Sequence, residues 1–130
     1  MALIETIDVA KYFSLTTYRR DGRAVPTPVW FARVGNHWYV FSAGNAGKVK
    51  RLRHTEAVTV AACDMRGKVS SEALTTSASL VLAPPDDTEA TGAYDALLAR
   101  YGWFMRLANW GATLTGRIHT RQLIRVVIPT

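Results

Sequence analysis

Basic side chains crowd the segment Gly47–Arg53, a few residues after an expected strand that ends in a hydroxyl at Ser42. Lys48 begins an expected short helix over Lys48–His54, where a cation opposes the helix dipole and is unfavourable unless an anion compensates it. Backbone N–H groups at a helix start also favour anions. The pattern predicts an anion site, such as a phosphate site, and a solvated basic face is the alternative.

The same segment is not a P-loop, because Val49 follows Gly47-Lys48 where that motif needs serine or threonine. Lys50 and Arg51 add positive charge, and the whole chain carries a net charge of +6. A basic protein attracts polyanions, either a phosphorylated small molecule or a nucleic acid. We do not expect nucleic acid, because the sequence carries no helix-turn-helix, zinc-finger or RNA-binding sheet motif.

Two prolines, Pro26 and Pro28, lie two residues apart in the expected strand Val25–Val34. Neither has an N–H donor, and residues two apart direct their backbone groups to the same edge of a strand. That edge cannot be paired, so it faces a bulge, solvent or a ligand. Thr27 directs its N–H and C=O to the opposite edge. A plain edge strand protected by proline is the alternative explanation.

Turn signals and alternating apolar residues predict a mainly β protein. Asp21-Gly22 and Gly35-Asn36 are typical of tight turns. The expected strands are Tyr12–Tyr18, Val25–Val34, His37–Ser42, Ala57–Cys63, Ser71–Leu82 and Leu123–Ile128. The expected helices are the first dozen residues, Lys48–His54, and a segment from Asp87 to about Leu107. Short strands with tight hairpins favour a closed or partly closed barrel, with an α+β sandwich as the alternative. We do not expect a doubly wound fold, because the first three strands follow each other with no room for crossover helices.

Length and composition fit one domain over residues 1–130. Hydrophobic residues make up 48% of the chain and charged residues 20%, close to the average for globular domains. The uncharged stretch Leu74–Pro85 is too short to span a membrane. Glu5 and Asp8 interrupt the region where a signal peptide needs an apolar run. We therefore expect a cytoplasmic protein that does not enter a membrane.

Residues that could act as nucleophiles or metal ligands form no recognisable motif. We interpret the single cysteine, Cys63, as a buried strand residue rather than a nucleophile. The histidines are scattered without the spacing of a metal site: His37, His54 and His119. The sequence therefore predicts no metal site, and it identifies no catalytic residue.

Several short motifs follow one another along the first half of the chain. They are Thr17 with Asp21-Gly22-Arg23, then Pro26-Thr27-Pro28-Val29-Trp30-Phe31, Tyr39-Val40-Phe41-Ser42, Gly47-Lys48-Val49-Lys50-Arg51-Leu52-Arg53 and Cys63-Asp64-Met65-Arg66-Gly67. In this order, the run Thr16–Arg66 resembles the split-barrel flavin-binding families, above all the small F420-dependent members of the pyridoxamine-phosphate-oxidase class. The resemblance resumes weakly at Arg100–Trp103 and Ile124–Pro129. It departs at Lys68–Glu72, so the resemblance does not determine the substrate side of the pocket.

The resemblance implies a six-stranded split β-barrel with a few short helices, and a homodimer with two cofactor sites at its interface. It implies that Lys48 and Ser42, beside Gly47, hold the cofactor phosphate. Lys50 and Arg51 would support the phosphate or the polyglutamate tail of F420. The strand expected along the tricyclic ring comprises Val25, Pro26, Thr27, Pro28 and Val29. Trp30 is expected in the core or the interface rather than stacked on the ring.

The implied activity is that of an F420-dependent oxidoreductase that transfers a hydride to or from a small organic substrate. An FMN-dependent oxidoreductase is the alternative, and a non-enzymatic flavin-, haem- or nucleic-acid-binding barrel is the third hypothesis. The cofactor carries such chemistry while the protein orients it, which fits a sequence without a catalytic dyad. The proton donor is left open among Tyr18, His37, Tyr101 and bulk water. Arg117-Ile118-His119 resembles the Arg-x-His with which pyridoxamine-phosphate oxidases hold their substrate.

Overall fold

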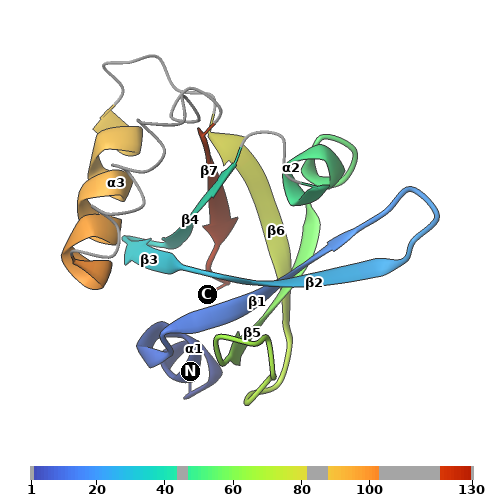
Figure 1. Cartoon of the computed structure of the whole chain (residues 1–130), viewed down its shortest axis with the longest axis horizontal. Coiled ribbons are helices and arrows are strands. Elements are labelled where there is room, and N and C mark those ends of the chain that lie inside the picture. Colours follow the sequence, from blue (N-terminus) through green and yellow to red (C-terminus); the bar gives the residue numbers. More distant parts are fainter. Residues whose placement is uncertain (1, 44–46, 82–87, 103–120, 130) are drawn as a thin grey trace.

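Seven strands in the described part of the chain form one curled antiparallel sheet (Figure 1). The computed structural model describes residues 2–43, 47–81, 88–102 and 121–129. The described strands are β1 (Tyr12–Tyr18), β2 (Ala24–Val29), β3 (Phe31–Val34), β4 (His37–Ala43), β5 (Ala57–Cys63), β6 (Leu74–Val81) and β7 (Arg121–Val127). The described helices are α1 (Ala2–Val9), α2 (Gly47–Leu52) and α3 (Thr88–Tyr101). The strand order across the sheet is β2-β1-β5-β6-β7-β4-β3.

The two outer strands of this sheet, β2 and β3, follow each other in the chain with only Trp30 between them. One residue adds at most about 3.6 Å of chain, so the two edges of the sheet must meet at this joint. The sheet therefore curls into a half-barrel (Figure 1). The prediction of a mainly β barrel is confirmed. The predicted count of six strands is wrong, because the expected strand Val25–Val34 divides at Trp30 into β2 and β3.

Large aromatic side chains fill the inside of the curled sheet. Phe13 and Phe31 stack with their ring centroids 4.2 Å apart, and Trp38 meets Phe13 edge-on. All three side chains are fully buried. Each such aromatic pair contributes about 0.5–1.5 kcal/mol beyond the burial of its apolar area. Because the rings come from β1, β3 and β4, this cluster joins the two halves of the sheet.

The longer helices cover two regions outside this aromatic core. α3 packs beside β3 (Figure 1), where Ala93 and Leu97 are fully buried in a second cluster with Ala32 and Tyr39. α1 lies near β1 and β5 and sends Ile7 into the main core. Of the helices in the described part of the chain, none is long and apolar enough to cross a membrane.

Some sequence predictions fall on residues outside the described ranges. These are the Arg117-Ile118-His119 motif and both ends of the expected helix, Asp87 and Leu107. Within the described part, that helix runs over Thr88–Tyr101. The expected strand Ser71–Leu82 is shorter at its start, because the Ser71 hydroxyl accepts a hydrogen bond from the Ala62 N–H (2.9 Å) before β6 begins.

A polar contact fastens α1 to the sheet. Asp8 accepts a hydrogen bond from the indole N–H of buried Trp38 at 2.7 Å, and its other oxygen forms an ion pair with Arg33 at 2.6 Å. A buried donor that loses its acceptor costs about 1–3 kcal/mol. The single carboxylate therefore couples α1 to both β3 and β4.

We expect Asp8→Ala to lower the free energy of unfolding by about 1–3 kcal/mol, because the Trp38 N–H loses its acceptor. Asp8→Asn keeps an oxygen for the indole and loses only the partly exposed ion pair, so its expected cost is about 1 kcal/mol or less. Urea unfolding followed by circular dichroism measures both losses. Equal losses would show that the hydrogen bond to the indole is not the dominant contact.

Candidate functional site

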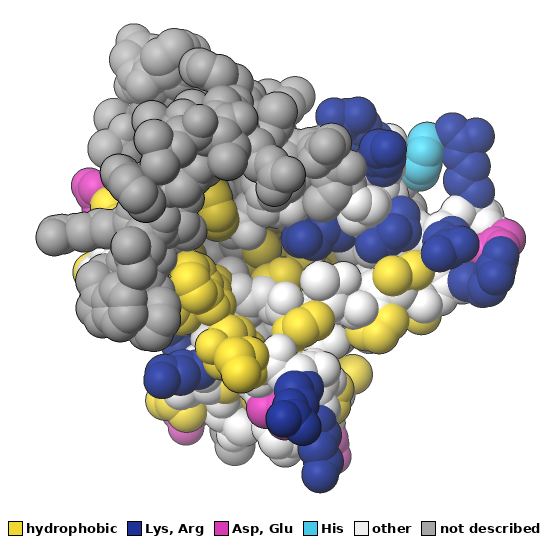
Figure 2. Space-filling model, viewed as in Figure 1, with side chains coloured by type: hydrophobic (Ala, Val, Ile, Leu, Met, Phe, Trp, Pro, Cys, Tyr) yellow, Lys and Arg dark blue, Asp and Glu magenta, His cyan; other side chains and the backbone are white. Residues whose placement is uncertain are grey.

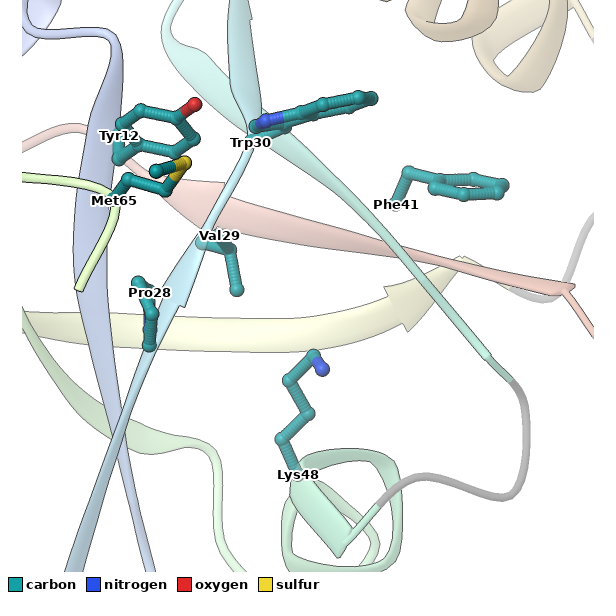
Figure 3. Close-up of a pocket in the computed structure, with 7 residues that line it drawn as sticks. All are labelled: Tyr12, Pro28, Val29, Trp30, Phe41, Lys48 and Met65. Carbon is teal, nitrogen blue, oxygen red and sulfur yellow. The ribbon is translucent and has the colours of Figure 1, made fainter. Parts of the chain in front are cut away.

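A hollow of about 250 Å³ lies at the seam of the curled sheet, between β2, β4 and α2 (Figure 3). Its lining residues come from elements far apart in the sequence: Tyr12, Pro28, Val29, Trp30, Phe41, Lys48 and Met65. A single cationic side chain thus faces apolar and aromatic walls. Small-molecule sites in proteins are typically apolar hollows with few polar groups. The hollow is therefore suited to an organic ligand that carries an anionic group.

The strand β2 brings Pro28 and Val29 to this hollow from the edge of the sheet. Among the described strands β2 pairs only with β1, so its other edge has no strand neighbour in that part of the chain. That free edge accommodates prolines, which have no donor to offer a partner strand. Val25 and Thr27 are half-buried on one face of β2, and Pro26 is exposed on the other. These three residues of the predicted site do not line the hollow.

Lys48 enters the hollow from α2 and reaches toward Val29 (Figure 3). Burial lowers the pKa of its ammonium group, and the positive charge of Arg51 lowers that pKa further. No carboxylate in the described part of the chain forms an ion pair with Lys48. Taking a charge out of water is costly unless a counter-charge compensates it. The surroundings of Lys48 therefore favour a bound anion.

The helix that carries Lys48 is too short to supply much field of its own. α2 has six residues and is anchored by buried Val49 and Leu52. The predicted helix reached His54, but the chain turns after Leu52, where the His54 N–H donates to the Arg51 carbonyl at 3.0 Å. The positive potential at the hollow thus comes from side-chain charges rather than from the helix dipole. Lys50 is exposed and does not line the hollow.

Arg51 lies across the start of α2 instead of entering the hollow. Its Nε donates to the hydroxyl of buried Thr17 at 2.5 Å. Its guanidinium also lies over Gly47, where an added Cβ would come within 2.7 Å of an Arg51 nitrogen. Burial, together with the charge of Arg19, lowers the pKa of Arg51. Gly47 and Arg51 therefore set the position of the helix start, and with it the position of Lys48.

The remaining polar candidates lie away from the hollow. Ser42 is buried on β4, opposite Gln122 of β7, and is not among the lining residues. Tyr18 and His37, which the sequence left open as proton donors, do not line it either. Tyr101 is half-buried, which raises the pKa of its hydroxyl, and that hydroxyl contacts main-chain atoms. In the described structure none of these groups is placed to give a proton to a ligand in the hollow.

A basic face continues outward from the hollow. Lys and Arg side chains gather over α2 and the tip of the β1–β2 hairpin (Figure 2). Arg20 contacts the ring of His54 at 3.3 Å and so links the hairpin tip to the end of α2. The nearby carboxylate of Asp21 is engaged by Arg23 in an ion pair of 2.9 Å. This face extends the positive potential of Lys48 toward solvent.

Four of the lining residues were not predicted as site residues from the sequence. These are Tyr12, Trp30, Phe41 and Met65. Tyr12 and Phe41 lie in expected strands, and only the curl of the sheet brings them to the same hollow as Lys48. Met65 gave one usable signal in the sequence, since it is an apolar residue in a polar turn. In the structure Met65 is 70% exposed. An exposed methionine at a turn is typical of a contact surface.

A second, more open hollow of about 640 Å³ lies between α1 and the segment 69–72. Its lining residues are Leu3, Thr6, Val69, Ser70, Ser71 and Glu72. The only charged group there is a carboxylate, so this hollow does not favour an anion. The hollow at Lys48 is therefore the candidate site for an anionic ligand.

Comparison with solved structures shows the fold. The chain is similar to HutZ, the haem storage protein from Vibrio cholerae, with 16% identity, a TM-score of 0.70 and coverage of 99% of this chain and 89% of HutZ. It is similar to an F420 reductase, with 20% identity, a TM-score of 0.60 and coverage of 97% of this chain and 93% of the reductase. It is also similar to a putative pyridoxamine 5'-phosphate oxidase from Listeria innocua, with 14% identity, a TM-score of 0.61 and coverage of 99% of this chain and 92% of that protein. No family model and no curated protein matches the chain. The neighbours are split-barrel proteins of the pyridoxamine-phosphate-oxidase type, and this chain has their fold.

We expect Lys48→Met to raise the free energy of unfolding of the ligand-free protein at neutral pH, by on the order of 0.5–1 kcal/mol, because it removes a desolvated charge. Folding lowers the pKa of Lys48 below the unfolded value of 10.5. Between these two pKa values the unfolded chain binds more protons, so wild-type stability rises with pH. The advantage of the variant should therefore shrink as the pH rises through that window.

The matched control is Lys50→Met, which removes the same charge from an exposed position of α2. Urea unfolding of the three proteins at neutral pH and near pH 10.5 measures the difference. An equal gain in both variants, or a gain that does not change with pH, would show that Lys48 is not desolvated.

Proposed function

We propose that this chain is an F420-dependent oxidoreductase that transfers a hydride between a bound deazaflavin and a small organic substrate. One observation carries the proposal: the half-buried Lys48, with a lowered pKa, faces a hollow of apolar and aromatic walls. The fold supports the cofactor class, because its structural neighbours include an F420 reductase and a putative pyridoxamine 5'-phosphate oxidase.

The residues of the hollow fit a tricyclic ring joined to a phosphate. Lys48 would hold the phosphate, because an ammonium without a carboxylate partner gains a charge-assisted contact there. Pro28 and Val29 offer an apolar strand edge to the ring, and Trp30 and Phe41 offer aromatic surface. Apart from Pro28 and Val29, the ligands predicted beside Lys48 do not line the hollow in one chain. We propose that Val25, Pro26 and Thr27 act at its margin and that Gly47 and Arg51 act by placing Lys48, whereas Ser42 and Lys50 do not line the hollow.

The bound cofactor supplies the hydride chemistry, and the protein supplies orientation and exclusion of water. The described lining fits a protein that orients its cofactor and excludes water. It contains one cation for binding and several apolar groups that keep water away, but no histidine, cysteine or carboxylate. We therefore expect the proton that completes reduction of the substrate to come from solvent or from the Tyr12 hydroxyl, the lining group that can donate one.

FMN is the alternative cofactor, because a ribityl phosphate is common to both molecules. The hollow offers the same cation to either phosphate, so Lys48 does not discriminate between them. The haem-storage neighbour makes haem a third ligand to test. Direct titration of the three molecules is the experiment that separates these proposals.

We further propose that the chain forms a homodimer with its cofactor at the interface. The hollow in one chain is about 250 Å³, below the roughly 300–1,000 Å³ usual for small-molecule sites. Met65 lies at its rim and is 70% exposed, which leaves an apolar surface uncovered. A second chain placed there would both cover Met65 and enlarge the lining of the hollow.

Titration of the purified protein with F420, FMN and haem tests the cofactor proposal. We expect one of the two ribityl-phosphate cofactors to bind with quenched fluorescence, and F420 to bind more tightly than FMN. Lys48→Ala should weaken that binding by about 10- to 100-fold, which corresponds to loss of a charged hydrogen bond of about 1.5–3 kcal/mol.

The control for this titration is Lys50→Ala, which makes the same change in net charge on the exposed side of α2. We expect it to weaken binding by less than about 3-fold, because exposed charges are screened. Equal losses in the two variants would point to a diffuse electrostatic effect. Binding of neither F420 nor FMN would overturn the proposed function.

Light scattering coupled to gel filtration tests the homodimer. The wild-type protein should elute with the mass of two chains, and Met65→Glu should shift it toward one chain and weaken cofactor binding, because it places a charge in an apolar interface. Val9→Glu adds the same charge at an 83% exposed position on α1 and should leave the mass unchanged. A wild-type monomer that binds the cofactor with full affinity would contradict the proposal.

A further inference from the structure

Trp30 has two roles in the structure. It joins β2 to β3, and its indole lines the hollow. A residue at such a joint lies outside the paired strands, so strand neighbours do not fix its side chain in the way they do within a sheet. The ring of Tyr101 packs against the indole instead, with centroids 4.8 Å apart and ring planes 11° from parallel. The wall of the hollow thus depends on a residue at the end of α3.

The hydroxyl of Tyr101 holds its ring in this position from the far end. It accepts a hydrogen bond from the Phe31 N–H at 2.9 Å. It also lies 2.8 Å from the carbonyl oxygen of Lys11 and 2.9 Å from that of Phe31, and it donates its one proton to either. The hydroxyl therefore bridges the start of β3 and the chain that leads into β1.

The neighbouring Arg100 fastens the same turn of α3. Its guanidinium lies 4.3 Å from the centre of the Phe31 ring and donates to the main-chain oxygens of Asp8 and Ala10. α3 ends at Tyr101, and Gly102 follows with a φ of 58°. The last turn of α3 is thus fixed to the end of α1 and to the joint of the sheet before any ligand binds.

We propose that Tyr101 is a positioning residue that holds the Trp30 indole in place as the aromatic wall of the cofactor hollow. The inference rests on the proposed function, since its consequence is a change in cofactor affinity. Tyr101 does not line the hollow itself, so it acts through Trp30. Its hydroxyl forms hydrogen bonds with main-chain groups at the joint, and we do not assign it as the proton donor to the substrate.

Removal of the Tyr101 ring frees the indole, which must then be ordered again when the cofactor binds. Ordering one such side chain corresponds to a loss of affinity of about 3- to 10-fold. We therefore expect Tyr101→Leu to raise the dissociation constant for F420 by this factor. Tyr101→Phe keeps the stacked ring and loses only the hydroxyl, so its expected change is less than about 3-fold.

A double-mutant cycle with Trp30→Leu separates this role from a general loss of stability. If Tyr101 acts through the indole, Tyr101→Leu has no further effect on the dissociation constant once Trp30 is leucine. Asp8→Ala is the control for stability, because it weakens the fold without touching the hollow. It should leave the dissociation constant unchanged. FMN replaces F420 as the titrant if only FMN binds.

A second readout needs no cofactor. The stacked pair of Trp30 and Tyr101 should give a near-ultraviolet circular dichroism band that Tyr101→Leu and Trp30→Leu each abolish, and that the double variant does not reduce further. This band survives even if no flavin binds, so failure of the proposed function is distinguished from failure of this inference. Tyr101→Met, which fills the space with a flexible side chain, replaces Tyr101→Leu if the latter does not fold.

Three results would overturn the inference. The first is an unchanged dissociation constant in Tyr101→Leu. The second is a loss of affinity that persists at full size in the Trp30→Leu background. The third is a near-ultraviolet band that Tyr101→Leu leaves intact. The positioning role is established if Tyr101→Leu lowers cofactor affinity in the wild-type background but not in the Trp30→Leu background. The near-ultraviolet band must also depend on both residues.

Discussion

The single residue Trp30, which joins β2 to β3, determines how the sheet curls and where the hollow lies. Because one residue connects the two outermost strands of the sheet, the sheet cannot stay open, and its edges must meet. That closure stacks Phe13 on Phe31 in the core and brings β2, β4 and α2 around a common hollow. The last turn of α3 holds the joint through Tyr101. The hollow is therefore a consequence of how the barrel closes rather than a feature of any one segment.

Desolvation of Lys48 is the second constraint, and it gives the hollow its chemical character. An ammonium that has lost water and gained only the like charge of Arg51 nearby is stabilised most by an anion. The apolar walls around it restrict that anion to one attached to an organic body. A phosphate on a planar ring system meets both conditions, and this combination supports a flavin-type cofactor more directly than the basic face of the protein does.

The sequence predicted those parts of the structure that depend on local chemistry. The prolines of β2 marked a free edge, and the glycines of Asp21-Gly22 and Gly35-Asn36 marked turns with φ values of 89° and 62°. The break at Trp30 had no local signal, because Val29, Trp30 and Phe31 all favour strands. The contribution of Tyr101 was also out of reach, since it depends on contacts between segments far apart in the chain. Pro28, Val29 and Lys48 meet in one hollow, but Ser42 and Lys50 lie apart from it.

Nuclear magnetic resonance of the backbone amides during a cofactor titration shows whether the hollow at Lys48 holds the cofactor. We expect F420 or FMN to shift the amides of Gly47–Leu52 together with those of Val29, Trp30 and Phe31, because the phosphate and the ring contact these two segments. Shifts confined to α1 and residues 69–72, at the second hollow, would contradict this expectation. Saturating cofactor that shifts no amide around Lys48 would contradict it as well.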